Sequence, residues 1–296
     1  MLAVIPRWKG WSLLLMLPLA AIFIPKPAPA LVIEFLDVGQ GDGIVILTDG
    51  FSGLVDCGSS SVSDVGTYRL IPRLKEAGIR ELDLVAATHA DADHCNGITA
   101  LIRQSRDVSG IRIGAIAISE CARDAEGYAE LLECAARYGI PVRRLKAGDC
   151  IVTRTLSLEC LHPAEDYEGA GNDNDASLVF YLRSGMFSAL LTGDLEAEGE
   201  RQITKLLEEK GGVTLLKAAH HGAGSSTGEE FLKAVLPRIT VISYGRDNRY
   251  GHPHADTIDR LRQCKSRIYN TAEDGAVRVE VDGDQILIKR FNDRKG

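Results

Sequence analysis

"THADADHCNG" (residues 88–97) puts two histidines and two aspartates directly after an apolar run. The run "LDLVAATH" (residues 82–89) is typical of a buried strand, so the polar side chains fall in the loop that follows. A helix cap, at Asp93 or Asn96, needs one such residue rather than four, and unpaired charges are costly at a partly buried strand end. Imidazole and carboxylate groups bind Zn²⁺ and Mn²⁺, so we predict metal binding by His89, Asp91, Asp93 and His94.

From Leu31 onward the chain alternates short apolar strands with helices, and neither a low-complexity linker nor a fixed-period repeat interrupts the pattern. Two successive blocks of this kind predict one α/β domain over residues 31–296, built as a four-layer αββα sandwich with mixed sheets. One helix is expected to begin after Asn96, and the run "VTLLKAAHHG" (residues 213–222) is expected to be a strand.

The composition is that of an ordinary globular protein, with 45% hydrophobic and 25% charged residues among 296. Lysine and arginine total 34 against 41 aspartates and glutamates, which gives a net charge of −7 without a long basic block. The overall charge therefore does not indicate a nucleic-acid binder, and some of the acidic groups are candidates for metal binding.

The first thirty residues differ from the rest. Arg7 and Lys9 precede the uncharged stretch "WSLLLMLPLAAIFI", which is shorter than the roughly 20 residues that a membrane-spanning helix needs. A basic start, a short apolar run and a small-residue end predict a secretory signal over residues 1–30, with a membrane anchor as the alternative. Both interpretations place the domain outside the cytoplasm, secreted or anchored on the outer face, and we predict no protein partner.

Seven cysteines are scattered along the chain without a C-x-x-C pair, so a zinc ribbon is not expected. Cys121 with Cys134, and Cys150 with Cys160, are the candidate disulfides in an oxidising compartment. The alternative is that the cysteines act as small buried hydrophobic residues.

The pattern H-x-D-x-D-H at residues 89–94 resembles the metal motif of the metallo-β-lactamase superfamily, whose commoner form has histidine where Asp91 stands. Further motifs follow in the order of that superfamily: "FLDVGQGDGIVI", "LVDCG", "NDASLVF", "LLTGDL", "LKAAHHG" and "SYGRDNRYGHP". The ordered set resembles the domain at the C-terminal end of ComEC-type DNA-uptake proteins. Each piece alone is a weak signal, whereas six in order make a specific one.

The resemblance implies a centre that holds two divalent ions, Zn²⁺ or Mn²⁺. His89 and Asp91 would bind one ion, and Asp194 would bridge the pair. The residues implied for the second ion are Asp93, His94 and His221. The usual third histidine of the first site is missing, because the region before "ASLVF" offers Asn174 and Asp175 instead. Oxygen donors make that first site harder, which favours Mn²⁺ or a weakly held ion over tight Zn²⁺.

The resemblance also implies catalytic roles for Asp93, Asp194 and His220, with His220 and His221 dividing metal binding and proton transfer in either order. Asp56 is predicted to accept a hydrogen bond from a metal-binding histidine, and the alternative is a strand-end turn. Asp42 lies in a glycine-rich turn that approaches the site or forms a tight hairpin.

Five residues are predicted to contact the substrate: Lys217, Asn174, Ser177, Asn248 and His252. Lys217 faces either an anionic substrate or the edge of the core. The loop "RDNRYGHPH" (residues 246–254) carries polar groups suited to phosphate oxygens, and the alternative is an ordinary surface turn.

These residues favour hydrolysis of a phosphodiester, most specifically in DNA, by a hydroxide held between two ions, as in an extracytoplasmic nuclease of the ComEC type. The alternative enzyme is a hydrolase for a small ester, amide or phosphodiester. The other alternative is a non-catalytic domain that binds DNA.

Overall fold

The computed structural model describes residues 28–121, 126–165, 167 and 173–292. Its first sheet runs in the order β15-β14-β1-β2-β3-β4-β5-β6. The strands are β1 (Leu31–Phe35), β2 (Gly43–Thr48), β3 (Phe51–Cys57), β4 (Glu81–Ala86), β5 (Arg112–Ser119), β6 (Val142–Leu145), β14 (Ala276–Asp282) and β15 (Gln285–Phe291). Strands β3 to β6 are mutually parallel, and the others pair antiparallel.

The second sheet runs in the order β13-β12-β11-β10-β9-β8-β7. Its strands are β7 (Cys150–Val152), β8 (Ser157–His162), β9 (Val179–Ser184), β10 (Phe187–Leu191), β11 (Leu215–Lys217), β12 (Ile239–Ile242) and β13 (Arg267–Asn270). Strands β10 to β13 are parallel, and β7 to β10 are antiparallel. Both sheets are therefore mixed, as the sequence predicts.

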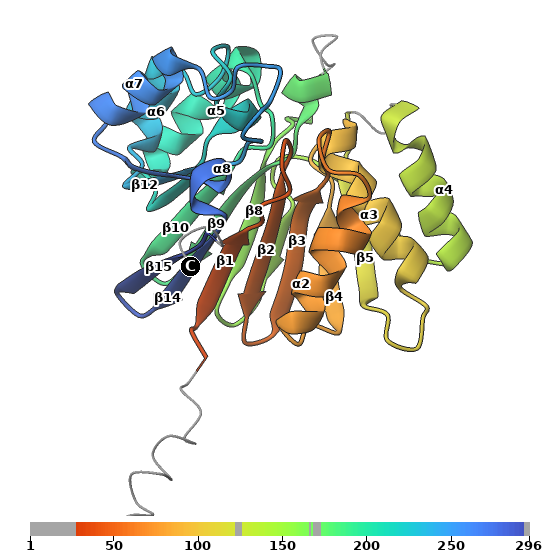
Figure 1. Cartoon of the computed structure of the whole chain (residues 1–296). Helices are drawn as coiled ribbons and strands as arrows, with labels where there is room; N and C mark the ends of the chain where they lie inside the picture. The colour runs from red at the N-terminus through yellow and green to blue at the C-terminus, as the bar shows by residue number, and fades with distance from the viewer. Residues whose placement is uncertain (1–27, 122–125, 166, 168–172, 293–296) are drawn as a thin grey trace, which may run out of the picture.

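Helices cover the outer face of each sheet, so the four-layer αββα sandwich is confirmed (Figure 1). The longer helices are α2 (Ile71–Glu76), α3 (Ala92–Gln104), α4 (Ala129–Tyr138), α5 (Ala197–Lys210), α6 (Glu229–Val235) and α7 (Ala255–Gln263), and the one-turn α8 is Thr271–Asp274. Helices α2 to α4 pack on the first sheet, and α5 to α7 pack on the second.

Three separate apolar clusters account for the four layers. Ile33 of the first sheet and Phe180 of the second belong to the cluster between the sheets. Along β10, Leu190 packs outward with the helices while Leu191 packs inward between the sheets. This period-2 alternation is what a strand covered on both faces requires, because successive side chains point to opposite faces.

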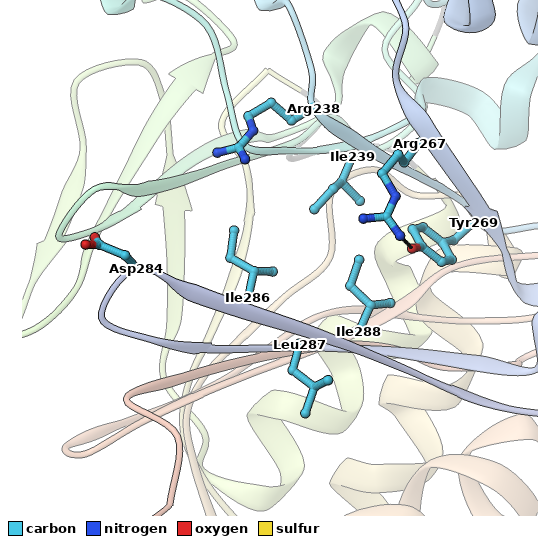
Figure 2. A pocket seen from close by; sticks show the side chains of 8 residues that line it. All are labelled: Arg238, Ile239, Arg267, Tyr269, Asp284, Ile286, Leu287 and Ile288. Carbon is cyan, nitrogen blue, oxygen red and sulfur yellow. Dashed lines mark hydrogen bonds between the residues drawn. The ribbon is translucent and has the colours of Figure 1, made fainter.

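The parallel strands bring distant loops together at one edge. Strands β3 and β4 pair in parallel, as do β10, β11 and β12, so the loops after these strands meet where the two sheets face each other. A pocket of about 460 Å³ lies elsewhere, between β15 and the N-terminal ends of β12 and β13 (Figure 2). Arg238, Arg267 and Ile286 line it, and its lining contains no histidine. The predicted metal ligands therefore do not face this pocket.

Two predicted element boundaries are wrong. Helix α3 begins at Ala92 rather than after Asn96, because the carbonyl of Asp91 already accepts hydrogen bonds from the backbone of His94 and Cys95. The run at residues 213–222 is a strand only over Leu215–Lys217. Beyond it the chain turns sharply at two consecutive left-handed residues, which cannot continue a strand.

None of the seven cysteines forms a disulfide in the described structure, so neither candidate disulfide is present. Cys150 lies opposite Glu159 in the β7–β8 pair, and the adjacent Cys160 therefore points to the other face of the sheet. Cys160 is buried between the sheets, while Cys150 is exposed. Cys121 donates a hydrogen bond to the carbonyl of Tyr167.

No helix within residues 28–292 that the structure describes has both the length and the apolar character needed to cross a membrane. The predicted signal or anchor lies almost wholly in residues 1–27, outside the described residues.

Shortening a side chain between the sheets should destabilise the whole sandwich. Phe180 is 1% exposed, and Phe180→Ala is expected to lower the free energy of unfolding by about 3–5 kcal/mol, because it leaves a cavity in the central layer. Met186 is 84% exposed, and Met186→Ala should change it by less than about 0.5 kcal/mol. Urea unfolding followed by circular dichroism measures both; equal losses would contradict this assignment of the core.

A candidate metal centre at the edge of the two sheets

The loop after β4 delivers two buried histidines to the edge of the sandwich. His89 and His94 are both fully buried, and their ring centroids lie 4.1 Å apart. Because α3 begins at Ala92, Asp93 and His94 lie in its first turn, where the helix dipole favours negative charge. The motif is therefore half loop and half helix, and its donors converge from both.

Asp56, at the end of β3, fixes the orientation of this loop. Its carboxylate accepts hydrogen bonds from the backbone N–H of Thr88 (2.7 Å) and from the Thr88 hydroxyl (2.9 Å). The Nδ1 atom of His94 lies 2.9 Å from the same carboxylate, which assigns the proton of that ring to Nδ1. The Nε2 atom of His94 therefore faces the cluster and can bind a metal ion once it has lost its proton.

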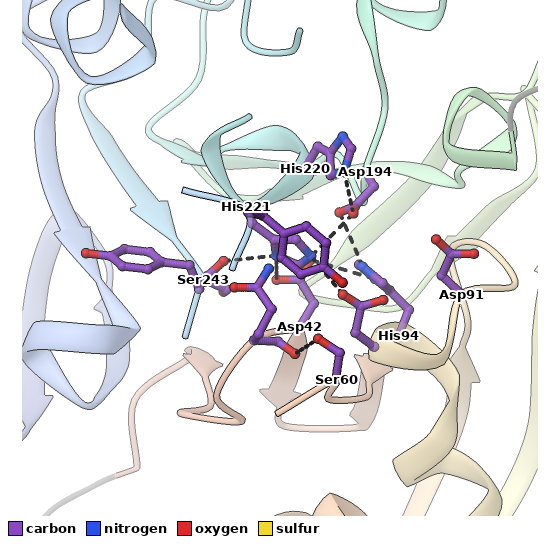
Figure 3. Close-up of polar contacts among 12 residues, drawn as sticks. Asp42, Ser60, Asp91, His94, Asp194, His220, His221 and Ser243 are labelled. Atoms are coloured by element: carbon purple, nitrogen blue, oxygen red, sulfur yellow. Dashed lines mark hydrogen bonds and ion pairs between the residues drawn. The ribbon is translucent and has the colours of Figure 1, made fainter. Parts of the chain in front are cut away.

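Asp194 lies between two imidazoles. Its Oδ1 is 3.3 Å from Nε2 of His94, and its Oδ2 is 3.3 Å from Nε2 of His221. The Nδ1 atom of His221 donates to the carbonyl of Ser243 (2.9 Å), so Nε2 of this ring also faces the cluster. Asp93 Oδ2 is 3.5 Å from the same Nε2. Figure 3 shows His94, Asp194 and His221 turned toward one another, with Asp91 standing to their side.

The two neighbouring histidines after β11 diverge because of an unusual backbone. His220 and His221 have φ values of 47° and 54°, in the left-handed region that residues other than glycine seldom adopt. His221 is buried and faces Asp194 and Asp93. His220 is partly exposed, with Nε2 at 3.7 Å from Asp194 and Nδ1 at 3.0 Å from Glu196. His221 thus lies inside the cluster, and His220 lies on its solvent side.

The cluster fits a divalent metal by its unsatisfied donors. Among the described residues, four buried side-chain atoms without a hydrogen-bond partner point into it: Nε2 of His89, His94 and His221, and Oδ1 of Asp194. Such atoms are costly unless something binds them. Donor atoms of His89, His94 and Asp194 lie within 4.8 Å of one another, as do those of Asp93, His94 and His221. Mixed imidazole and carboxylate donors suit Zn²⁺ and Mn²⁺.

The electrostatics of the cluster favour charged groups despite burial. Burial alone would raise the pKa of the Asp194 carboxyl, but His221 and His94 hold it well below its usual range. Burial would lower the pKa of His221, yet the carboxylate of Asp194 raises it to about 9. Burial also opposes ionisation of Asp93, whose pKa the adjacent His221 and the charge of His94 lower to about 2. Without metal, protons on the histidines neutralise the acids, so metal binding must release protons.

The site predicted for the first ion, at His89 and Asp91, departs most from the arrangement that the resemblance implies. The Asp91 side chain is 54% exposed and lies 3.7 Å from Nε2 of His89. Asp175 is buried away from the ions' expected place, because its Oδ1 accepts hydrogen bonds from the backbone of Glu196 (3.0 Å) and Gly199 (3.1 Å). Asp175 therefore stabilises the start of α5, and the structure does not bring it to His89 as a donor.

Lys217, for which the sequence leaves open a position facing the substrate or one at the edge of the core, is a buried cation at this site. The Lys217 side chain is completely buried, and its ammonium forms an ion pair with Asp42 and lies 3.6 Å from Oδ1 of Asp194. It also donates to the carbonyl of Gly193 (3.0 Å). Asp42 in turn lies 3.8 Å from Nδ1 of both His94 and His221. Lys217 therefore faces the carboxylates from inside the protein, not the solvent from which a substrate would come.

The remaining residues predicted to contact substrate lie around the cluster in different roles. Ser177 is buried, and its hydroxyl accepts a hydrogen bond from the backbone N–H of Asp194 (3.2 Å). Asn174 is half-buried, with Nδ2 at 3.4 Å from Glu196. Asn248 holds its own loop together through the backbone of Gly245 and His252. The ring of His252 lies 6.2 Å from that of His221.

Removing the carboxylate that orients His94 should weaken metal binding. Asp56→Ala is expected to lower the affinity for Zn²⁺ or Mn²⁺ about 10–100-fold, because His94 loses the acceptor that fixes its tautomer. Isothermal titration calorimetry gives the affinity. Asp49→Ala is the matched control, because Asp49 is exposed and its ion pair within the described residues is with the exposed Arg154. An unchanged affinity in Asp56→Ala would contradict the orienting role.

The metal-free protein should lose stability in acid partly through His252. Burial, then the charges of His221 and His220, lower the pKa of His252 to about 4. The unfolded chain protonates this ring near pH 6.5, so the folded state loses stability as pH falls from about 6.5 to 4. His252→Gln should lose less stability over this range in urea unfolding at pH 7.5 and 5. Equal losses in both proteins would refute the contribution of His252.

The comparisons with known proteins agree with this geometry. The profile described as "Metallo-beta-lactamase superfamily" matches residues 36–246. The chain is 31% identical over 259 residues to ComE operon protein 3 of Bacillus subtilis, covering 83% of this chain and 32% of that protein. It is 30% identical over 272 residues to Recombination protein 2 of Haemophilus influenzae, covering 91% of this chain and 31% of that protein. It thus spans about a third of these curated relatives.

Solved structures share the fold at low sequence identity. CmlA, a diiron β-hydroxylase from Streptomyces venezuelae, superposes with a TM-score of 0.58 at 15% identity, covering 87% of this chain and 55% of that chain. YhfI, a metallo-β-lactamase fold protein from Bacillus subtilis, gives 0.51 at 16% identity, covering 83% and 99%. The resemblance to ComEC-type competence proteins is confirmed by the curated relatives. The chain belongs to the metallo-β-lactamase superfamily.

Proposed function

We propose that the protein hydrolyses phosphodiesters, with DNA as the main substrate. The observation that carries the proposal is a cluster of buried donor atoms that form no hydrogen bond within the described structure: Nε2 of His89, His94 and His221, and Oδ1 of Asp194. Donor atoms of His89, His94 and Asp194 lie within 4.8 Å of one another, as do those of Asp93, His94 and His221. Competence proteins among the relatives favour DNA as the substrate class. A shared fold does not determine the substrate. The choice of a phosphodiester therefore rests on the site and on the relatives together.

We assign two sets of ligands to two divalent ions. Asp93, His94 and His221 would hold one ion, whereas His89 and Asp91 would hold the other more weakly. Asp194 lies within reach of both sets. Such ions lower the pKa of a bound water and neutralise charge that develops on a phosphoryl group.

Residues around the two ion positions would orient the ligands, transfer a proton and balance charge. Asp56 orients His94, and the Ser243 carbonyl orients His221, so both nitrogens are held in position before any ion arrives. His220 stands at the solvent side of Asp194, beside Glu196, where a ring can give a proton to a leaving oxygen. The buried Lys217 offsets part of the negative charge of Asp42 and Asp194.

We further propose an extracytoplasmic location, with residues 1–30 as a signal or an anchor. The basic start and short apolar run of these residues support it. The domain would then meet DNA on the outer side of the membrane.

Loss of one ligand should abolish hydrolysis. With Mn²⁺ or Zn²⁺ the chain is expected to cleave labelled DNA and bis-p-nitrophenyl phosphate, whereas Asp93→Ala should lower kcat/KM at least about 100-fold, because it removes a ligand of the tighter ion. Asp259→Ala is the control, since this exposed residue of α7 forms its ion pair, in the part of the chain that the structure describes, with Arg262.

Two results would overturn parts of the proposal. Equal cleavage by the parent chain and Asp93→Ala would discard the metal site as the source of activity. Turnover of the small diester without any cleavage of DNA would keep the reaction and replace the substrate.

A further inference from the structure

The loop after β12 is held rigidly beside the metal centre. Asn248 donates to the carbonyls of Gly245 and His252, both at 2.7 Å, and accepts from the backbone N–H of His252 at 2.9 Å. The N–H of Gly245 donates to the side chain of Gln40 (3.0 Å), which fastens the loop to the glycine-rich turn before β2. None of these bonds involves Arg249 or Tyr250, which lie at the tip of the loop.

A series of rings leads from the metal centre to the solvent. His220, near Asp194, has its ring centroid 5.5 Å from that of His252. The ring of His252 lies 5.7 Å from that of Tyr250, and the two planes differ by only 22°. Tyr250 is 44% exposed. An aromatic side chain thus stands at the surface, separated from the predicted reaction centre by the rings of His252 and His220.

Arg249 adds an available positive charge at the same point. Its guanidinium lies 5.1 Å from the centre of the Tyr250 ring, and Nη2 donates to the Tyr250 hydroxyl at 3.0 Å. Among the described residues Arg249 forms no ion pair with a carboxylate. Arg246 of the same loop differs, because its guanidinium donates twice to the carbonyl of Ala272 and so fixes the loop.

We propose that Tyr250 and Arg249 form a binding subsite for one nucleotide of a single-stranded nucleic acid, next to the bond that is cut. The inference rests on the proposed function and names its substrate class. The base stacks on the part of the Tyr250 side chain that His252 and Arg249 leave exposed, and the Arg249 guanidinium pairs with a neighbouring phosphate. A duplex keeps the faces of its bases stacked inside the helix, so this subsite favours a single strand.

The test compares Tyr250→Leu with Tyr250→Phe in the full chain with Mn²⁺. The leucine variant loses the aromatic face, so its kcat/KM for a single-stranded oligonucleotide should fall about tenfold relative to that for methyl p-nitrophenyl phosphate. The phenylalanine variant keeps the face and should stay within about twofold of the parent chain. Tyr68→Leu is the matched control, because Tyr68 is an exposed tyrosine on another element.

A second measurement needs no catalysis. Titration of the metal-free chain into a single-stranded oligonucleotide that contains 2-aminopurine should change its fluorescence through stacking, and Tyr250→Leu should weaken this binding about tenfold at fixed salt. Arg249→Gln should weaken it as well and reduce its salt dependence. If Tyr250→Leu and Tyr68→Leu give the same values in both assays, the subsite is refuted. A parent chain that cleaves neither substrate but shows the titration difference refutes the proposed function and leaves the subsite standing.

Discussion

The contact on which the site depends is the one between the Asp194 carboxylate and two imidazoles, those of His94 and His221. The three side chains belong to segments that follow different strands, β4, β10 and β11, and are buried at the edge where both sheets meet. Burial makes each group costly on its own, so the carboxylate and the rings stabilise one another, and hydrogen bonds to Asp56 and to the Ser243 carbonyl hold the rings in place. The same constraint leaves both Nε2 atoms available to a cation.

The sandwich explains how such distant residues can meet. Parallel pairing within each sheet aligns the ends of β3, β4, β10, β11 and β12, and the apolar layer between the sheets fixes their separation. Local distortions then aim the side chains. The left-handed backbone at His220 and His221 turns one ring inward and the other toward the solvent. Fold stability and site geometry are therefore linked through the central core.

Much of this could be predicted from the sequence, because each motif lies at the end of an apolar strand and period-2 patterns locate strands well. The ordered motifs led to the correct superfamily and the four layers. Contacts between distant segments were not readable: the burial of Lys217 against Asp42 depends on how a strand of one sheet meets a turn of the other. Asp175 was considered as a metal ligand but stabilises the start of α5, since either role suits an aspartate before a strand. The face of the sheet to which Cys160 points depends on a register that composition does not specify.

We propose that Asp93, His94 and His221 hold a divalent metal ion beside Asp194, whose carboxylate contacts both imidazoles. The most direct measurement is the metal content of the purified chain after dialysis against limiting Zn²⁺ or Mn²⁺, by mass spectrometry of the ions, beside that of a folded Asp194→Asn variant. We expect between one and two bound ions per chain in the parent protein, and a large loss of bound ions in the variant. A parent chain that retains no ion, or a variant that retains as many, would contradict it.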